Sequence, residues 1–158
     1  KIEIENIEEY VDKIGDFFTV NTIKDSNTFF HSVLKCMGYE KYNEGSEKIK
    51  QELARYLRIE VTEKIKDPEY MKGKLNKNLG INYVVKNLEL KKEIEPEIAV
   101  YLARAMFCNI VVYINKEYID INPVEKNPTF IFNYNNNAYK PIVLLISGES
   151  NITLNYPA

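Results

Sequence analysis

Apolar residues recur at helical spacing through the first two thirds of the chain, whereas the last third holds short apolar runs separated by polar turns. The opening segment IENIEEYVDKIGDFF predicts a short helix, because Ile4, Ile7, Val11 and Ile14 share one helical face and Gly15 ends the pattern. The segment FFTVNTI that follows reads as extended. Further helices are predicted over residues 29–37, 46–66, 68 to Gly73 or Gly80, and 96–107.

Residues that start and stop helices support these assignments. Ser46 is expected to cap the long helix that runs to Lys66. Pro68 and Pro96 each stand at a first helical position, where proline is favoured. Gly38 ends the helix that begins at Phe29. The chain therefore places its helices early and its strands late.

Short apolar runs predict the strands, which cover residues 109–116, 129–135 and 139–147, with a last edge strand over 151–156. A turn at Asn135-Asn136-Asn137 joins the second strand to the third. Helices followed by strands indicate an α+β fold, a small sheet packed by helices. The core is expected to bury Ile98 and Leu102 of the last helix, and Val111, Ile131 and Val143 of the strands.

Length and composition narrow the class of protein. The 158 residues suit one domain, 1–158, and its lysine start suggests a piece excised from a larger protein. No apolar run approaches the ~18 residues of a membrane span. A net charge of −2 argues against nucleic-acid binding. We expect a cytoplasmic protein.

The two cysteines, Cys36 and Cys108, lie in apolar segments and are predicted to be buried free thiols. The chain has one histidine and no paired CxxC or HxxxH spacing, so neither a metal site nor a cofactor is predicted.

A polar turn, Lys24-Asp25-Ser26-Asn27-Thr28, runs directly into the helix that begins at Phe29. A helix N-terminus stabilises a thiolate or an oxyanion, and many enzymes place a nucleophile there. A cysteine protease also needs a histidine within reach of its thiol and a polar group that orients this histidine. In this chain the junction residue is Thr28, and the lone histidine is His31.

These residues resemble a family, the OTU (ovarian-tumour) cysteine proteases, mostly deubiquitinases, whose nucleophile helix opens with D-G-N-C-[LF]-F-[RH]-[AS]. The chain has DSNTFFHSV there: Asp25 fits, Ser26 replaces the glycine, and Thr28 stands where the nucleophilic cysteine belongs. Many viral members end in a segment like H-Y-E-P-I. Here the segment is AYKPI, with Ala138 in place of the general-base histidine and Lys140 where a residue often orients that histidine.

The segment EIAVYLARAMFCNIVVY, residues 97–113, looks like the family's central helix and core strand, so the resemblance covers roughly Phe18 to Leu145. It implies the papain-like OTU fold with a mostly antiparallel sheet. It also implies a degenerate site at Asp25, Thr28, Ala138 and Lys140, with no catalytic residue.

Each candidate residue also has a structural interpretation. Thr28 is expected to cap the helix or complete the turn, and Asp25 to bond backbone amides two residues on. His31, one turn into the helix, is expected to be structural, and Cys36 to belong to the core. Tyr134, Tyr139 and Tyr156 are candidates for a contact surface.

Three hypotheses follow. The first is a pseudoenzyme, an OTU-like interaction or structural module inside a larger viral or bacterial protein, located in host cytoplasm or virion if viral. Its partner would be a protein, with ubiquitin or a ubiquitin-like protein to be tested. The second is an active cysteine deubiquitinase that carries inactivating substitutions at positions 28 and 138. The third is an unrelated α+β domain whose motifs match by chance.

Overall fold

The computed structural model describes residues 2–3, 11–14, 17–71, 80–119, 126–145 and 151–153. Its helices are α1 (Thr28–Met37), α2 (Glu40–Asn43), α3 (Glu47–Lys66), α4 (Pro68–Met71), α5 (Ile81–Glu89), α6 (Pro96–Leu102) and the 3₁₀ helix η2 (Ala103–Met106). Its strands are β1 (Ile2–Glu3), β2 (Val11–Ile14), β3 (Phe17–Val20), β4 (Asn109–Ile114), β5 (Glu117–Ile119), β6 (Thr129–Asn135), β7 (Ala138–Leu145) and β8 (Asn151–Thr153). The α+β class predicted from the sequence is confirmed.

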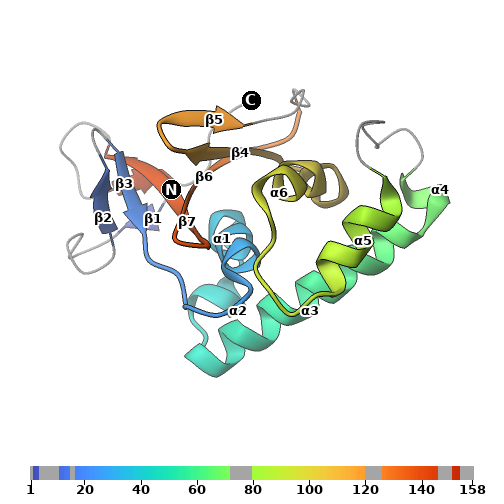
Figure 1. Cartoon of the computed structure of the whole chain (residues 1–158). Helices are drawn as coiled ribbons and strands as arrows, with labels where there is room; N and C mark the ends of the chain where they lie inside the picture. The colour runs from blue at the N-terminus through green and yellow to red at the C-terminus, as the bar shows by residue number, and fades with distance from the viewer. Residues whose placement is uncertain are drawn as a thin grey trace.

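The described strands form one sheet in the order β1-β8-β7-β6-β4-β5, and the hairpin of β2 and β3 joins it through β3 and β7. Among the described strand pairs β4–β6 is parallel, with Val112 opposite Phe132, and the others are antiparallel. Helix α1 lies between the sheet and α3, and α6 packs on β4 (Figure 1). The N-terminus of α1 therefore points at the region where β7 begins.

The expected starts and stops of the helices are largely confirmed. Ser46 caps α3, and its hydroxyl accepts a hydrogen bond from the amide of Ile49 at 3.3 Å. Gly38 ends α1 in the left-handed conformation at φ 69°, which costs glycine little. Gly80 precedes α5 and does not close α4, and Gly73 lies outside the described residues. Four elements in the described part of the chain, β1, α2, α5 and β5, were not predicted from the sequence.

The predicted opening helix is wrong where the structure describes it, because Val11–Ile14 is strand β2. It pairs with β3 antiparallel, Val11 opposite Val20 and Ile14 opposite Phe17. Four residues with β-branched ends fit either element, and pairing with a neighbouring strand decided between them. The positions of Ile4 and Ile7 lie outside the described residues. The predicted edge strand β8 is also not at an edge, since it pairs with β7 and with β1.

The core is apolar and rich in aromatic rings. Ile98 and Leu102 are fully buried, as predicted, but Val111 and Ile131 are only half-buried. The buried positions are their neighbours: Ile110, Val112, Phe130 and Phe132. Successive side chains of a strand point to opposite faces, so the prediction selected the less buried face of each strand. The side chain of Val143 lies outside the described ones.

None of the helices in the described part of the chain combines the length and the apolar character needed to cross a bilayer.

Candidate functional site

The turn before α1 is built by side chains that bond its backbone. Asp25 Oδ1 accepts a hydrogen bond from the amide of Asn27 at 2.8 Å, as predicted for a turn-forming aspartate. Asn27 precedes the helix but does not cap it with its side chain. Its side-chain oxygen instead accepts from Arg58 Nη1 at 2.8 Å. The turn is thereby fixed from both sides, and Thr28 becomes the first residue of α1.

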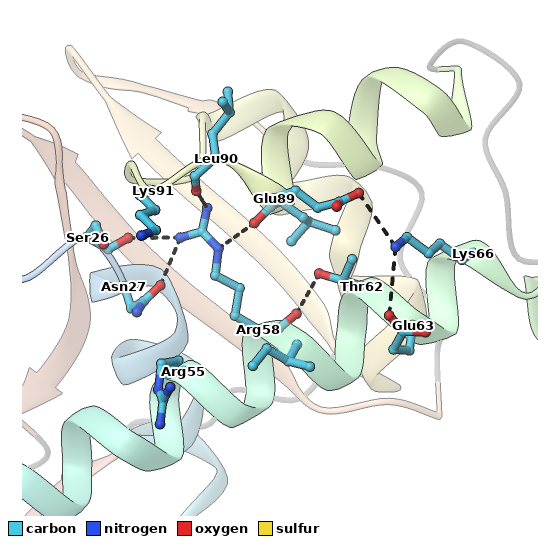
Figure 2. A pocket seen from close by; sticks show the side chains of 12 residues that line it. Ser26, Asn27, Arg55, Arg58, Thr62, Glu63, Lys66, Glu89, Leu90 and Lys91 are labelled. Atoms are coloured by element: carbon cyan, nitrogen blue, oxygen red, sulfur yellow. Dashed lines mark hydrogen bonds and ion pairs between the residues drawn. The ribbon is translucent and has the colours of Figure 1, made fainter.

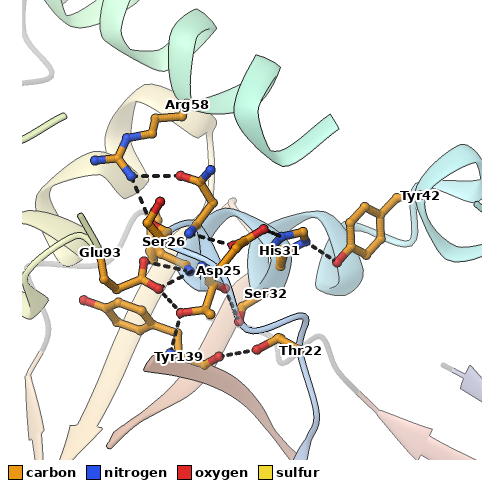
Figure 3. A network of polar contacts seen from close by, with 12 residues as sticks. Thr22, Asp25, Ser26, His31, Ser32, Tyr42, Arg58, Glu93 and Tyr139 are labelled. Carbon is orange, nitrogen blue, oxygen red and sulfur yellow. Dashed lines mark hydrogen bonds and ion pairs between the residues drawn. The ribbon is translucent and has the colours of Figure 1, made fainter. Parts of the chain in front are cut away.

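Thr28 and Ala138 lie together, as the resemblance requires. Ala138 is the first residue of β7, and the amide of the next residue, Tyr139, donates to Thr28 Oγ1 at 2.7 Å. Thr22 Oγ1 donates to the carbonyl of Tyr139 at 2.8 Å and ties the start of β7 to the segment before the turn (Figure 3). The bond between Thr28 and Tyr139 joins residues 111 positions apart, and it places the start of β7, where Ala138 lies, beside the start of α1.

Thr28 and Ala138 line one cavity of about 530 Å³. Asp25, Lys24 and Lys140 also line it, together with a group of asparagines: Asn133, Asn135, Asn136 and Asn137. Asn136 and Asn137 have φ of 51° and 59° and form the tight turn between β6 and β7. The four positions of the predicted degenerate site, Asp25, Thr28, Ala138 and Lys140, thus share one cavity.

Glu93 is the part of this site that the sequence did not reveal. Its Oε1 accepts from the amide of Thr28 at 2.8 Å and also from the Thr28 hydroxyl. Its Oε2 accepts from the amide of Phe29 at 3.3 Å and from the amide of Ile94 at 3.2 Å. Burial raises the pKa of Glu93, and these hydrogen bonds oppose that rise. A glutamate in the mixed segment KKEIEPE carries no pattern that would single it out.

The expected cap at Thr28 therefore needs correction. The carboxyl of Glu93 bonds the first two amides of α1, and the Thr28 hydroxyl bridges Glu93 and the amide of Tyr139. The longer side chain of Glu93 reaches these amides from a distant segment, and the Thr28 hydroxyl oxygen accepts from strand β7 instead of from its own helix.

His31 is fully buried and both of its ring nitrogens have partners. Nε2 lies 2.8 Å from Asp25 Oδ2, and Nδ1 lies 2.7 Å from the hydroxyl of Tyr42 in α2 (Figure 3). Burial, followed by the charge of Asp25, raises the pKa of Tyr42. The ring thus joins the turn to α2, which supports the structural role predicted for it. The contact with Tyr42 had no sequence signal.

Arg58 of α3 anchors the other side of the turn. Its Nη1 donates to the carbonyl of Ser26 at 3.1 Å, and its Nη2 donates to the carbonyl of Leu90 at 2.7 Å (Figure 2). The guanidinium also donates to the carbonyls of Asn87, Leu88 and Lys92. A second cavity, of about 510 Å³, lies beside it between α3 and residues 88–91. Arg58 thereby holds the 87–92 segment, and with it Glu93, against the turn.

The remaining candidates have structural surroundings. Cys36 and Cys108 are buried free thiols, as predicted, and burial raises the pKa of both, that of Cys108 to about 12. Tyr139 is fully buried among Phe29 and Phe132, so its proposed place on a contact surface is wrong. Tyr134 is half-buried, and Tyr156 lies outside the described residues. The described residues hold no group of three or more metal-ligating side chains.

Comparison with known proteins bears on the fold. No family model and no curated protein matches the sequence. Among solved structures the chain is similar to the Hazara virus OTU bound to ubiquitin, at 14% identity and a TM-score of 0.50, over 87% of each chain. It is also similar to the viral OTU domain protease of Taggert virus, at 13% identity and a TM-score of 0.48, over 94% of this chain and 88% of that one. The chain has an OTU-like fold.

Proposed function

We propose that this chain is a catalytically inactive OTU-like domain that acts as a protein-interaction or structural module. The observation that supports this best is the pairing of Thr28 with Ala138 at the N-terminus of α1 and the start of β7. An OTU-like site needs a thiol and an imidazole at this meeting point. A threonine hydroxyl and a methyl group supply neither a good nucleophile nor a proton acceptor.

The bonding of the Thr28 hydroxyl adds to this support. Its oxygen accepts from the amide of Tyr139 and its hydrogen is directed to Glu93. The carboxyl of Glu93 is itself held by the amides of Thr28, Phe29 and Ile94, and no imidazole faces the hydroxyl. Loss of the nucleophile or the base alone removes about 10⁶ of rate in a serine protease, because these residues act as a unit. Backbone donors alone leave too little rate for turnover.

The second candidate is an active cysteine deubiquitinase that carries inactivating substitutions at positions 28 and 138. Alanine at position 138 suits that reading. The Thr28 hydroxyl, however, bonds two buried partners, the carboxyl of Glu93 and the amide of Tyr139. This fit favours threonine as the native residue at position 28.

The test of inactivity uses the unmodified chain with ubiquitin chains of each linkage and with a thiol-directed ubiquitin probe. We expect neither cleavage nor labelling. Thr28→Cys with Ala138→His should cleave weakly, and each single variant should not. Robust turnover by the unmodified chain would refute the proposal.

The partner is a separate question. Because the similar Hazara virus domain is bound to ubiquitin in its solved structure, ubiquitin is the first candidate for this chain as well. Titration of the chain into isotope-labelled ubiquitin, followed by chemical-shift changes, tests this directly. Shifts confined to one surface of ubiquitin would support binding, and unchanged spectra at millimolar chain would exclude ubiquitin as the partner.

A further inference from the structure

A carboxyl group of the protein itself occupies the N-terminus of α1. The first amides of a helix have no partner within the helix and carry partial positive charge, so they attract anions. Here the carboxyl of Glu93, 4% exposed, bonds the amides of Thr28 and Phe29 and the hydroxyl of Thr28. These amides are the donors that would face a developing oxyanion beside a nucleophile at position 28.

The segment that carries Glu93 is held on both sides. Arg58 Nη2 donates to the carbonyl of Lys92 at 2.8 Å, immediately before Glu93. The hydroxyl of Tyr139 donates to the carbonyl of Ile94 at 2.6 Å, immediately after it. Figure 3 shows Glu93 between Arg58 and Tyr139, directed at the start of α1. The carboxyl is thus placed by two anchors from different elements, α3 and β7.

We propose that Glu93 is an internal anion that takes the place of a substrate oxyanion at the N-terminus of α1, and so closes the site independently of Thr28 and Ala138. The inference rests on the proposed function and adds a third element to it. The amide N–H of Thr28 already donates to Glu93 Oε1 at 2.8 Å. It therefore cannot also donate to an oxyanion on the substrate. A carboxylate in this position also disfavours a thiolate at position 28, because like charges repel.

The first test measures a thiol introduced at position 28. Thiolate absorbance is measured against pH for Thr28→Cys and for Thr28→Cys/Glu93→Gln. The absorbance of Thr28→Ser, which retains Cys36 and Cys108, is subtracted from each to remove the signal of those two thiols. We expect Glu93→Gln to lower the pKa of the introduced thiol by about one unit or more. Glu97→Gln, at an exposed position of α6, removes the same charge and should leave that pKa unchanged. An equal pKa with and without Glu93 would overturn the inference.

The second test needs no substitution and covers the case in which Glu93→Gln fails to fold. The amide protons of Thr28 and Phe29 and the side-chain carboxyl carbon of Glu93 are followed by NMR as the pH changes. We expect all three to titrate together. Amide protons that stay constant while the carboxyl titrates would overturn the inference.

The third test measures activity. Adding Glu93→Gln to Thr28→Cys/Ala138→His should raise the rate of ubiquitin-chain cleavage about tenfold or more. The reason is that one additional hydrogen-bond donor to the oxyanion raises the rate by this factor or a larger one. Equal rates in the double and triple variants would contradict the role of Glu93. Cleavage by the unmodified chain would instead refute the proposed function, so the two failures are distinguishable.

Discussion

Arg58 should contribute more to stability than its neighbours on α3, and Arg58→Met tests this. The substitution keeps most of the aliphatic length and removes the guanidinium. That group donates to five backbone carbonyls and to the side chain of Asn27, and it lies 5.9 Å from the centre of the Phe30 ring. It thereby joins three segments: the turn before α1, α3, and residues 87–92.

The expected magnitude follows from the burial of the acceptors. The bonds to the carbonyls of Leu88 and Asn87 are buried, whereas the other four are partly exposed and water can replace Arg58 there. A buried acceptor left without a partner costs about 1–3 kcal/mol, so the two together cost about 2–6 kcal/mol. Arg58→Lys should fall between, because an ammonium has three donors and cannot span six acceptors.

Equilibrium unfolding in urea, monitored by circular dichroism, measures the change. The matched control is Arg55→Met, one turn earlier on the same helix and exposed, which should change the free energy of unfolding by less than about 0.5 kcal/mol. If Arg58→Met proves no more destabilising than Arg55→Met, the argument that Arg58 anchors the 87–92 segment is wrong.

Three further predictions concern the core and its buried titratable groups. Leu102→Ala, at a fully buried position, should cost about 2–5 kcal/mol in the same assay, and a loss below about 0.5 kcal/mol would show that this helix face is not in the core. Burial raises the pKa of Glu93 above its ordinary 4.5, so the folded chain binds the carboxyl proton more tightly than the unfolded chain does. The free energy of unfolding should therefore fall as the pH rises from about 4.5 through the folded pKa of Glu93. Glu93→Gln should remove that decline in urea titrations between about pH 4 and 7, and an unchanged pH profile would contradict it. Cys36 and Cys108 should resist a thiol reagent at pH 8 in the native chain and react in urea, whereas native labelling at the unfolded rate would show that they are accessible.

The ends of several helices could be predicted from the local sequence. Ser46 marks the start of α3 and Gly38 the end of α1, because capping depends on residues within a few positions of the helix end. The pair Thr28 and Ala138 was recognised by residue identity at two motifs. In the structure both residues line one cavity, and Thr28 accepts a hydrogen bond from the amide of Tyr139, the residue after Ala138, which supports that interpretation.

Other features depended on which segments meet in space. Residues 11–14 became a strand because β3 offered a partner, and Val112 is buried instead of Val111 because packing selected one face of an apolar strand. Glu93 lies 65 residues from the amide of Thr28 that it bonds, and Arg58 reaches residues about 30 positions away on either side. Burial of a charged side chain is favourable only where distant groups satisfy its hydrogen bonds, and no local pattern of apolar and polar residues encodes that arrangement.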